Sequence, residues 1–443
     1  MTFSFDLAVV LQRGRSRTKR RRRQRDIYKS EPSQEITFDL MIDILTRLPP
    51  KSLMRFKSVS KLWSSLICSK NFTNCFRKVS SPRPRLYMWL GIDNKNVLLS
   101  SSSSPKYVST MSSLVVDQDL TIPAMKGYSV SQVFHGLMCF TNGQSAQIYN
   151  TTTRQLVFLP AIEESNLLAE NDKSKRTMYY LGHDSIHDQY KVFCTVSKRG
   201  KRVGNLVTWV SEHWVYVLGG GDVSSRWRNI PTSCPPHRPL TQFNTINIHG
   251  RMLYYLARTH LSKCVLVSFD MISEEISVPQ LPEDLVFWPR LPIMIEIVDW
   301  GGRVAFLDYP DFEDEGDGFE NEVVMKVWVM EDAETNLWSS KTLMLPPSQM
   351  NILNMPVVVN LSLMPRGTTR EGEVIFVPQI VRYSKRTLNI SIDPQETTDF
   401  YIFIYNIQKN HMRKVEITKS STRYVTTKWD VIGLDDVENL MYL

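Results

Sequence analysis

The 443-residue chain has little cysteine, little glycine and no long apolar run. Its six cysteines include no C-x-x-C pair, which excludes a zinc ribbon and a dense disulfide framework. The longest uncharged apolar candidate, residues 350–365, contains three Asn and is too short and polar to span a membrane. The apolar LAVVL (7–11) follows Asp6 and precedes its basic residues, which is unlike a signal peptide. We expect an intracellular protein with reduced cysteines and no membrane segment.

Acidic residues are almost missing from the N-terminus. Asp6 is the only acid before residue 26, whereas residues 13–25 hold nine Lys or Arg. We expect residues 1–34 to be a disordered basic arm, because like charges repel and the segment has little apolar material. Residues 26–443 keep 44 basic and 44 acidic groups, so the net charge of +8 belongs to the arm. A folded body with a basic groove for phosphate is therefore not expected.

The basic arm has three interpretations. The favoured one is a nuclear-localisation segment, which places the protein in the nucleus, the cytoplasm or both. Its candidate residues are Lys19, Arg20, Arg21, Arg22, Arg23 and Arg25. The second is a nucleic-acid-binding protein acting through the arm, with a salt-dependent affinity that disappears on deletion of residues 13–25. The third is a solvated tail.

A compact helical pattern begins at Ile36. Apolar residues recur at helical spacing through Leu48, stop at Pro49 and Pro50, and resume from Leu53 to Ile67. Three short helices in about forty residues expose too much of their apolar surface to be self-sufficient. Such an exposed stripe indicates a partner.

After residue 85 the sequence alternates between short strands and turns. The runs are aromatic and β-branched and are bounded by Gly, Pro, Asn or Asp. They include residues 86–90, 137–140, 147–150, 190–196, 206–210, 213–218, 252–257, 264–269, 324–330, 373–378 and 400–407. Because no long amphipathic helix separates them, they predict a large antiparallel all-β domain.

A degenerate repeat narrows the architecture. The repeat unit has three parts: a strand ending in Phe-Asp or Tyr-Asn, then a polar strand, then Leu-Pro or Ile-Pro. This unit recurs about every 50 to 70 residues. The copies are residues 147–160, 226–231, 266–282, 337–347 and 403–417. This spacing is typical of the blades of a kelch-like β-propeller. The glycine content, 19 of 443 residues, is low for a protein with so many turns and argues against a propeller.

The helical segment ITFDLMIDILTRLPPKSLMRFKSVSKLWSSLI (36–67) resembles the F-box motif. Arg-Leu-Pro at 47–49, Lys-Ser-Leu-x-Arg-Phe at 51–56 and Val-Ser-Lys-x-Trp-x-x-Leu-Ile at 59–67 all match the family pattern. One departure is Thr37, which stands where the family has proline; we expect it to loosen the first loop. The fold class is thus α+β, with a three-helix F-box at 35–78.

The rest of the chain, residues 85–443, resembles the plant F-box-associated domain of the third type. The matching segments include HGLMCF (135–140), YLGHDSIHDQYKV (180–192), INIHGRMLYYLA (246–257) and DDVENLMYL (435–443). His183 stands where the family commonly has Tyr.

Together the two resemblances imply a substrate-recognition subunit of an SCF-type cullin-RING ubiquitin ligase. The F-box would bind a Skp-type adaptor, and through it a cullin, while the β domain would hold an unidentified target protein. Such a receptor needs no catalytic group and no cofactor. The predicted adaptor-binding residues are Leu40, Leu48, Pro49, Leu53, Val59 and Trp63. The alternative for Val59 and Trp63 is packing inside the helical unit only.

Two segments superficially resemble metal sites. His183 and His187 stand four apart, but they lack an H-E-x-x-H helix and a third ligand, so we interpret them as solvated histidines in a turn. Asp311–Glu322 has acids at calcium-loop positions, but Gly318 replaces an apolar residue and the flanks are strand-like, which favours a solvated hairpin loop.

Two further segments carry no chemistry in this interpretation. GGGD (219–222) follows a strand without a helix behind it, so it is expected to be a turn and not a phosphate cradle. The run Ser100–Ser104 is interpreted as a flexible surface linker. No Ser-His-Asp or Cys-His signature suggests catalysis.

Overall fold

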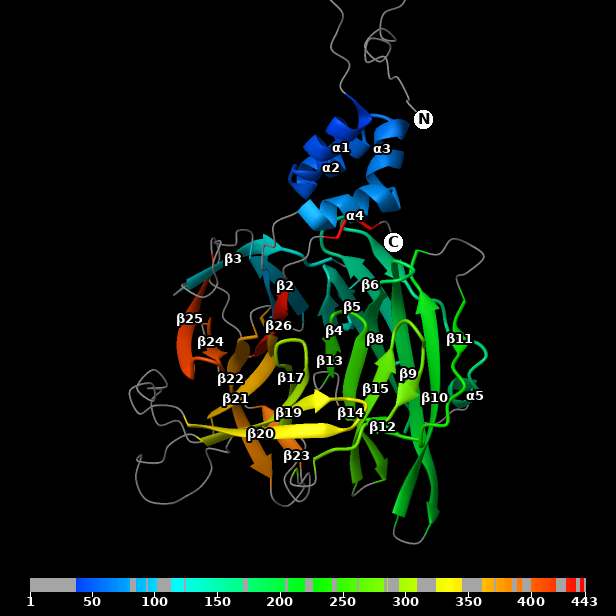
Figure 1. The fold of residues 1–443 in the computed structure, drawn as a ribbon, viewed down its shortest axis with the longest axis vertical. Helices are drawn as coiled ribbons and strands as arrows, with labels where there is room; N and C mark the ends of the chain where they lie inside the picture. Colours follow the sequence, from blue (N-terminus) through cyan, green and yellow to red (C-terminus); the bar gives the residue numbers. More distant parts are fainter. Residues whose placement is uncertain are drawn as a thin grey trace, which may run out of the picture. The chain divides into compact units, whose positions relative to one another are not determined.

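A computed structural model describes residues 37–441, apart from several internal segments, of which the longest are 102–112, 286–294, 309–323, 345–360 and 420–427. The chain divides into two compact units, with the division between residues 81 and 82. Figure 1 shows the first unit as helices in blue and the second as strands from cyan to red. Within the described residues, no helix is long and apolar enough to cross a membrane.

The helical unit contains four described helices. They are α1 (Phe38–Thr46), α2 (Pro50–Lys57), α3 (Lys61–Ile67) and α4 (Lys70–Val79). Pro50 occupies the first turn of α2, where its missing N–H costs nothing. Ser60 caps α3 by accepting from the backbone N–H of Trp63 at 3.2 Å. Three helices were expected; the fourth follows at once because Ser69 accepts from the N–H of Phe72 at 3.2 Å and starts a new helix.

The second unit is built from groups of four antiparallel strands, which we call blades 1 to 6. Parallel pairing of residues 416–419 with residues 113–116 joins blades 6 and 1 into one nine-stranded sheet, and pairing of Thr208 with His260 joins blades 3 and 4 into another. Blade 1 is β26 (Lys428–Asp435), β1 (Arg85–Ile92), β2 (Lys95–Ser101) and β3 (Ser113–Asp119). Blade 2 is β4 (Ser129–Phe134), β5 (Leu137–Asn142), β6 (Ser145–Asn150) and β7 (Leu156–Phe158). Blade 3 is β8 (Arg176–Asp184), β9 (Gln189–Val203), β10 (Leu206–Val217) and β11 (Arg228–Asn229).

The other three blades follow in chain order. Blade 4 is β13 (Thr245–Ile248), β14 (Met252–His260), β15 (Lys263–Asp270) and β16 (Ile276–Ser277), with β12 (Arg238–Pro239) also paired to β14. Blade 5 is β17 (Ile295–Asp299), β18 (Val304–Asp308), β19 (Val324–Asp332) and β20 (Leu337–Met344). Blade 6 is β21 (Leu361–Thr368), β22 (Val374–Ser384), β24 (Phe400–Asn406) and β25 (His411–Lys419), with β23 (Asn389–Ile392) paired to β22. A short helix, α5 (Asn166–Ala169), lies between blades 2 and 3 in the chain.

Apolar layers join each blade to the next. On β24, Phe403 and Tyr405 pack toward blade 5, while Ile402 and Ile404 pack toward blade 1. Side chains alternate along a strand, so a strand buried on both faces has an almost continuous apolar sequence. Six such layers connect blade 1 to 2, 2 to 3 and so on back to 1. The blades therefore form a closed ring, which confirms the expected β-propeller.

Two links close the ring between the chain ends. The last strand, β26, pairs antiparallel with β1, next to the inner strand β21 of blade 6; Figure 1 shows β26 in red beside the first strands. The tail then reaches blade 2, where the Asn439 side chain donates to the carbonyl of His135 at 2.9 Å. Asn150 donates to the carbonyl of Met441 at 3.0 Å, and Leu440 is buried. Closure leaves few exposed sheet edges.

The repeat seen in the sequence corresponds to the outer strands of blades 2 to 6. Its copies contain β6–β7, β11, β15–β16, β20 and β24–β25. Five hairpin turns share one design, in which an Asn or Asp side chain accepts from backbone N–H groups two or three residues later. The residue four positions on has a φ between 47° and 64° and is never glycine: Arg154, Asp188, Glu274, Asn336 and Asn410. The turns thus form with little glycine, and for this reason its scarcity did not exclude a propeller.

Two expectations about local structure were wrong. The runs 206–210 and 213–218 form one strand, β10, because Ser211 and Glu212 continue its pairing with β9. Ser100 and Ser101 are not a surface linker: both are buried in β2, and Ser101 accepts from the N–H of Leu86 at 3.0 Å. The basic arm and Asp311–Glu322 lie outside the described residues, although strands β18 and β19 flank the second segment as expected.

Candidate functional site

The helical unit exposes large apolar side chains on α1 and around the start of α3. Leu40 is 50% exposed and Ile44 46%, one turn apart on α1. Val59 is 58% exposed and Leu62 48%, while Phe38 at the start of α1 is 41% exposed. We call these five residues the apolar helical surface. Exposed apolar side chains gathered on so small a unit indicate a protein partner.

The six predicted adaptor-binding residues differ in accessibility. Leu40, Pro49 and Val59 are exposed, and Leu48 and Trp63 are half-buried. Leu53 is wholly buried, so this structure gives it no surface to offer a partner, and it acts as a core residue. Trp63 stacks on Phe56 with ring centroids 5.4 Å apart, as the packing alternative proposed. Val59 does not follow that alternative, because most of its surface faces solvent.

Thr37, where the F-box pattern has proline, is the N-cap of α1. Its φ of −61° is one that proline also adopts, and its hydroxyl accepts from the N–H of Leu40 at 3.4 Å. Thr37 therefore supplies a side-chain cap to α1, and the expected loosening of the first loop stays a prediction. On the next turn Arg47 pairs with Asp43 at 3.1 Å.

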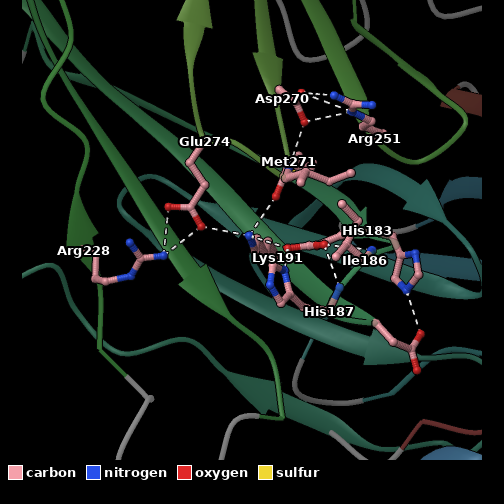
Figure 2. A network of polar contacts seen from close by, with 12 residues as sticks. His183, Ile186, His187, Lys191, Arg228, Arg251, Asp270, Met271 and Glu274 are labelled. Atoms are coloured by element: carbon pink, nitrogen blue, oxygen red, sulfur yellow. Dashed lines mark hydrogen bonds and ion pairs between the residues drawn. The ribbon is translucent and has the colours of Figure 1, made fainter.

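The two predicted turn histidines have different environments (Figure 2). His187 is exposed and contacts Asp184 Oδ2 through Nδ1 at 2.8 Å. His183 is buried on β8, with Nε2 3.1 Å from Asp188 Oδ1 and its ring 4.7 Å from that of Tyr190. The expectation of two solvated histidines was wrong for His183. Strand β8 continues to Asp184, so His183 belongs to the strand and its side chain is buried. Among the described residues, no group of three His, Cys, Asp or Glu side chains could hold a metal ion.

A buried lysine that the sequence did not single out connects this turn to blade 4. Lys191 Nζ lies 2.9 Å from Asp184 Oδ2 and 2.8 Å from Glu274 Oε1, and donates to the carbonyl of Met271 at 2.7 Å. Figure 2 shows Lys191 at the centre of these contacts, with Arg228 on the far side of Glu274. One cation satisfied by two carboxylates and a carbonyl is a structural clamp, since all its donors are in use.

The clamp lowers the pKa of both carboxyl groups. Burial raises the pKa of Asp184, but hydrogen bonds from the His187 N–H and from Lys191 outweigh it, so this pKa lies well below its usual range. Burial also opposes ionisation of Glu274, and the hydrogen bonds from Arg228 and Lys191 lower its pKa more. Both groups are therefore ionised at neutral pH.

Comparisons with known proteins agree with this division of the chain. Residues 34–75 match the family model of the F-box domain, and residues 85–439 match that of the F-box associated beta propeller domain. The chain belongs to the family of F-box proteins that carry this propeller domain. It is 54% identical to the F-box/kelch-repeat protein At4g19930 and to the F-box protein At4g19940 of Arabidopsis thaliana, over the full length of each chain. It is 36% identical to the F-box/LRR-repeat protein At2g40920 of the same plant, over 93% of this chain and 88% of that one.

Proposed function

We propose that the protein is the substrate-recognition subunit of an SCF-type cullin-RING ubiquitin ligase. The observation that carries the proposal is the apolar helical surface on a unit that matches the F-box domain. Leu40, Ile44, Val59 and Leu62 present side chains that a Skp-type adaptor would cover. A cullin would join through the adaptor, and the propeller would hold the target protein.

The receptor acts by position and supplies no reacting group. Holding a target lysine near a charged ubiquitin-conjugating enzyme turns a bimolecular encounter into an effectively intramolecular one. A closed propeller suits this task, because its six layers fix the loops that contact a target. Specificity belongs to those loops, whereas the F-box fixes only the choice of ligase.

The basic arm is proposed to direct the protein to the nucleus. Lys19, Arg20, Arg21, Arg22, Arg23 and Arg25 form its core. The alternative, binding of nucleic acid by the arm, has the support of the same charges and differs in predicting direct, salt-dependent affinity.

Co-purification of the tagged full chain from plant cells, followed by mass spectrometry, tests the function. Recovery of an adaptor of the Skp type together with a cullin supports it. Recovery of nucleic acid and RNA- or DNA-associated proteins, without adaptor or cullin, contradicts it. Proteins that accumulate when the proteasome is inhibited are the candidate targets.

A further inference from the structure

Four arginines surround one cavity between blades 3 and 4. The cavity has a volume of about 230 Å³, and its charged and aromatic lining is Arg176, Arg199, Trp209, Arg238 and Arg258; Pro239 and Leu240 complete the wall. We call it the arginine pocket. It lies at the end of β8 remote from the turn with His183, since Arg176 is the first residue of that strand.

The register of the strands forces the like charges together. Arg238 on β12 stands directly opposite Arg258 on β14, and Arg199 on β9 stands opposite Trp209 on β10. The Arg238 guanidinium carbon lies 4.8 Å from the centroid of the Trp209 ring. Like charges directly opposite across a sheet are destabilising. Burial and the guanidinium groups of Arg176, Arg199 and Arg258 lower the pKa of Arg238.

Within the described part of the chain, no carboxylate forms an ion pair with any of the four guanidinium groups. Two donors at the pocket, Nε of Arg258 and Nε1 of Trp209, are buried without a hydrogen-bond partner. Arg176 makes a neutral contact, from Nη1 to the carbonyl of Leu240 at 2.9 Å. Unpaired buried donors and unneutralised charge are costly, and an anion removes both costs at once.

We propose that the arginine pocket binds a phosphate monoester. A monoester carries nearly two negative charges and three terminal oxygens, and guanidinium forks match it in bidentate geometry. A carboxylate has half that charge, and a phosphodiester offers one charge and two free oxygens per group. A cavity of about 230 Å³, with Pro239 and Leu240 in its wall, has the size for a single terminal group and not for an extended backbone. The source is either a phosphorylated side chain of a protein or a soluble organic phosphate; the first would make the pocket part of target recognition and then rests on the proposed function.

The test uses the purified full chain at constant ionic strength. Inorganic phosphate, a phosphoserine peptide with its unphosphorylated counterpart, a sugar phosphate and a single-stranded oligonucleotide are titrated by calorimetry, and the melting temperature is followed in parallel. The variant R238Q/R258Q removes the opposed pair. The matched control K126Q/K409Q loses the same charge at two exposed lysines away from the pocket.

We expect inorganic phosphate to raise the melting temperature of the wild type and of the control. We also expect R238Q/R258Q to lose at least tenfold in affinity while melting no lower than the wild type without ligand, because the repulsion is relieved. A residue pair with only a structural role would instead lower that melting temperature. The single variant Arg199→Gln, at an exposed position, must also weaken binding.

The ligands separate the two sources. A phosphoserine peptide that binds at least tenfold more tightly than the sugar phosphate identifies a protein-borne group, and the reverse identifies a soluble one; either supports the pocket. No binding of any monoester at millimolar concentration overturns the proposal, and so does preference for the oligonucleotide. Adaptor binding of R238Q/R258Q, measured in the same preparation, reports separately on the proposed function.

Discussion

Lys191 and Glu274, 83 residues apart in the sequence, are joined by an ion pair of 2.8 Å that connects blade 3 to blade 4. The same ammonium group holds Asp184 at 2.9 Å. Replacing Lys191 by Met leaves the buried Asp184 carboxylate without its ammonium partner and Glu274 with Arg228 alone, which is more costly than losing an attraction. We predict a loss of about 3 kcal/mol in the free energy of unfolding, measured by urea denaturation.

The double variant K191M/E274Q separates charge from packing. Removing the charge of Glu274, the second carboxylate at the lost ammonium group, should recover part of the stability lost in K191M. The exposed Lys126→Met serves as the control and should change stability by less than about 0.5 kcal/mol. Equal stability of K191M and the wild type would show that the clamp contributes nothing.

A buried pair of histidines predicts acid sensitivity. His213 and His237 stack with ring centroids 4.9 Å apart, and His237 Nε2 lies 2.8 Å from the hydroxyl of Tyr255. Burial, with the neighbouring His237, lowers the pKa of His213 to about 3; burial also lowers the pKa of His237. Each group is neutral when folded and binds a proton more readily when unfolded. Stability is therefore complete above pH 6.5 and is lost as the pH falls toward 3.

At pH 5 the loss from His213 should be about 2 kcal/mol, and His237 adds a further loss in the same direction. In His213→Phe, which keeps a ring beside Phe193, the slope of stability against pH between 6.5 and 5 should fall. Parallel pH profiles of the variant and the wild type would show that His213 is not the source of the slope.

Glu296 on β17 predicts the opposite pH dependence. Burial raises its pKa to about 8, against a smaller lowering effect of Arg366. The folded protein holds this carboxyl protonated, so its contribution is full below pH 4.5 and is lost as the pH rises toward 8. Glu296→Gln should be more stable than the wild type by roughly 5 kcal/mol at pH 8.5 and nearly equal to it at pH 4.5, by thermal melts. The exposed Glu163→Gln should show no such divergence.

If the basic arm is a nuclear-localisation segment, its deletion should change where the protein lies in the cell without changing adaptor binding. A fluorescent fusion that lacks residues 13–25 should lose nuclear enrichment in plant cells, while its co-precipitation with adaptor stays unchanged. Purified full chain should show no more than weak, salt-sensitive affinity for single-stranded RNA or DNA. Tight binding that disappears on the same deletion would favour the nucleic-acid alternative over a localisation segment.

The architecture was predictable because its signals are periodic. Runs such as residues 400–407 are apolar or aromatic at every position except Asn406, as expected of strands packed on both faces, and the repeat located outer strands of five blades. The scarcity of glycine was a poor argument against the propeller. Asn150 and its counterparts stabilise the turns by side-chain hydrogen bonds, and residues such as Arg154 and Glu274 adopt the positive φ that glycine would otherwise supply. The closing pair of β26 with β1 joins the two ends of the domain, which no local pattern shows.

The arginine pocket escaped the sequence interpretation because charge was summed over the whole body. Residues 26–443 balance at 44 and 44, yet residues 223–269 contain no acid at all. Arg238 and Arg258 both lie in that segment, and strand pairing places them face to face. A count over short windows would have found the excess, but only the fold brings Arg176 and Arg199 to the same cavity. The clamp around Lys191 was also not predicted, since Met271 and Glu274 lie 80 and 83 residues from it in the sequence.

Affinity of the purified full chain for a Skp-type adaptor tests directly whether the apolar helical surface is an adaptor-binding site. L40D/V59D places two charges on the apolar helical surface, at positions exposed enough to leave the helical core intact. F158D/I186D places the same charges at exposed apolar positions of the propeller. We predict tight binding by the wild type and by F158D/I186D, and at least a hundredfold loss in L40D/V59D. Equal affinity of all three proteins, or no binding by a folded wild type, would contradict this prediction.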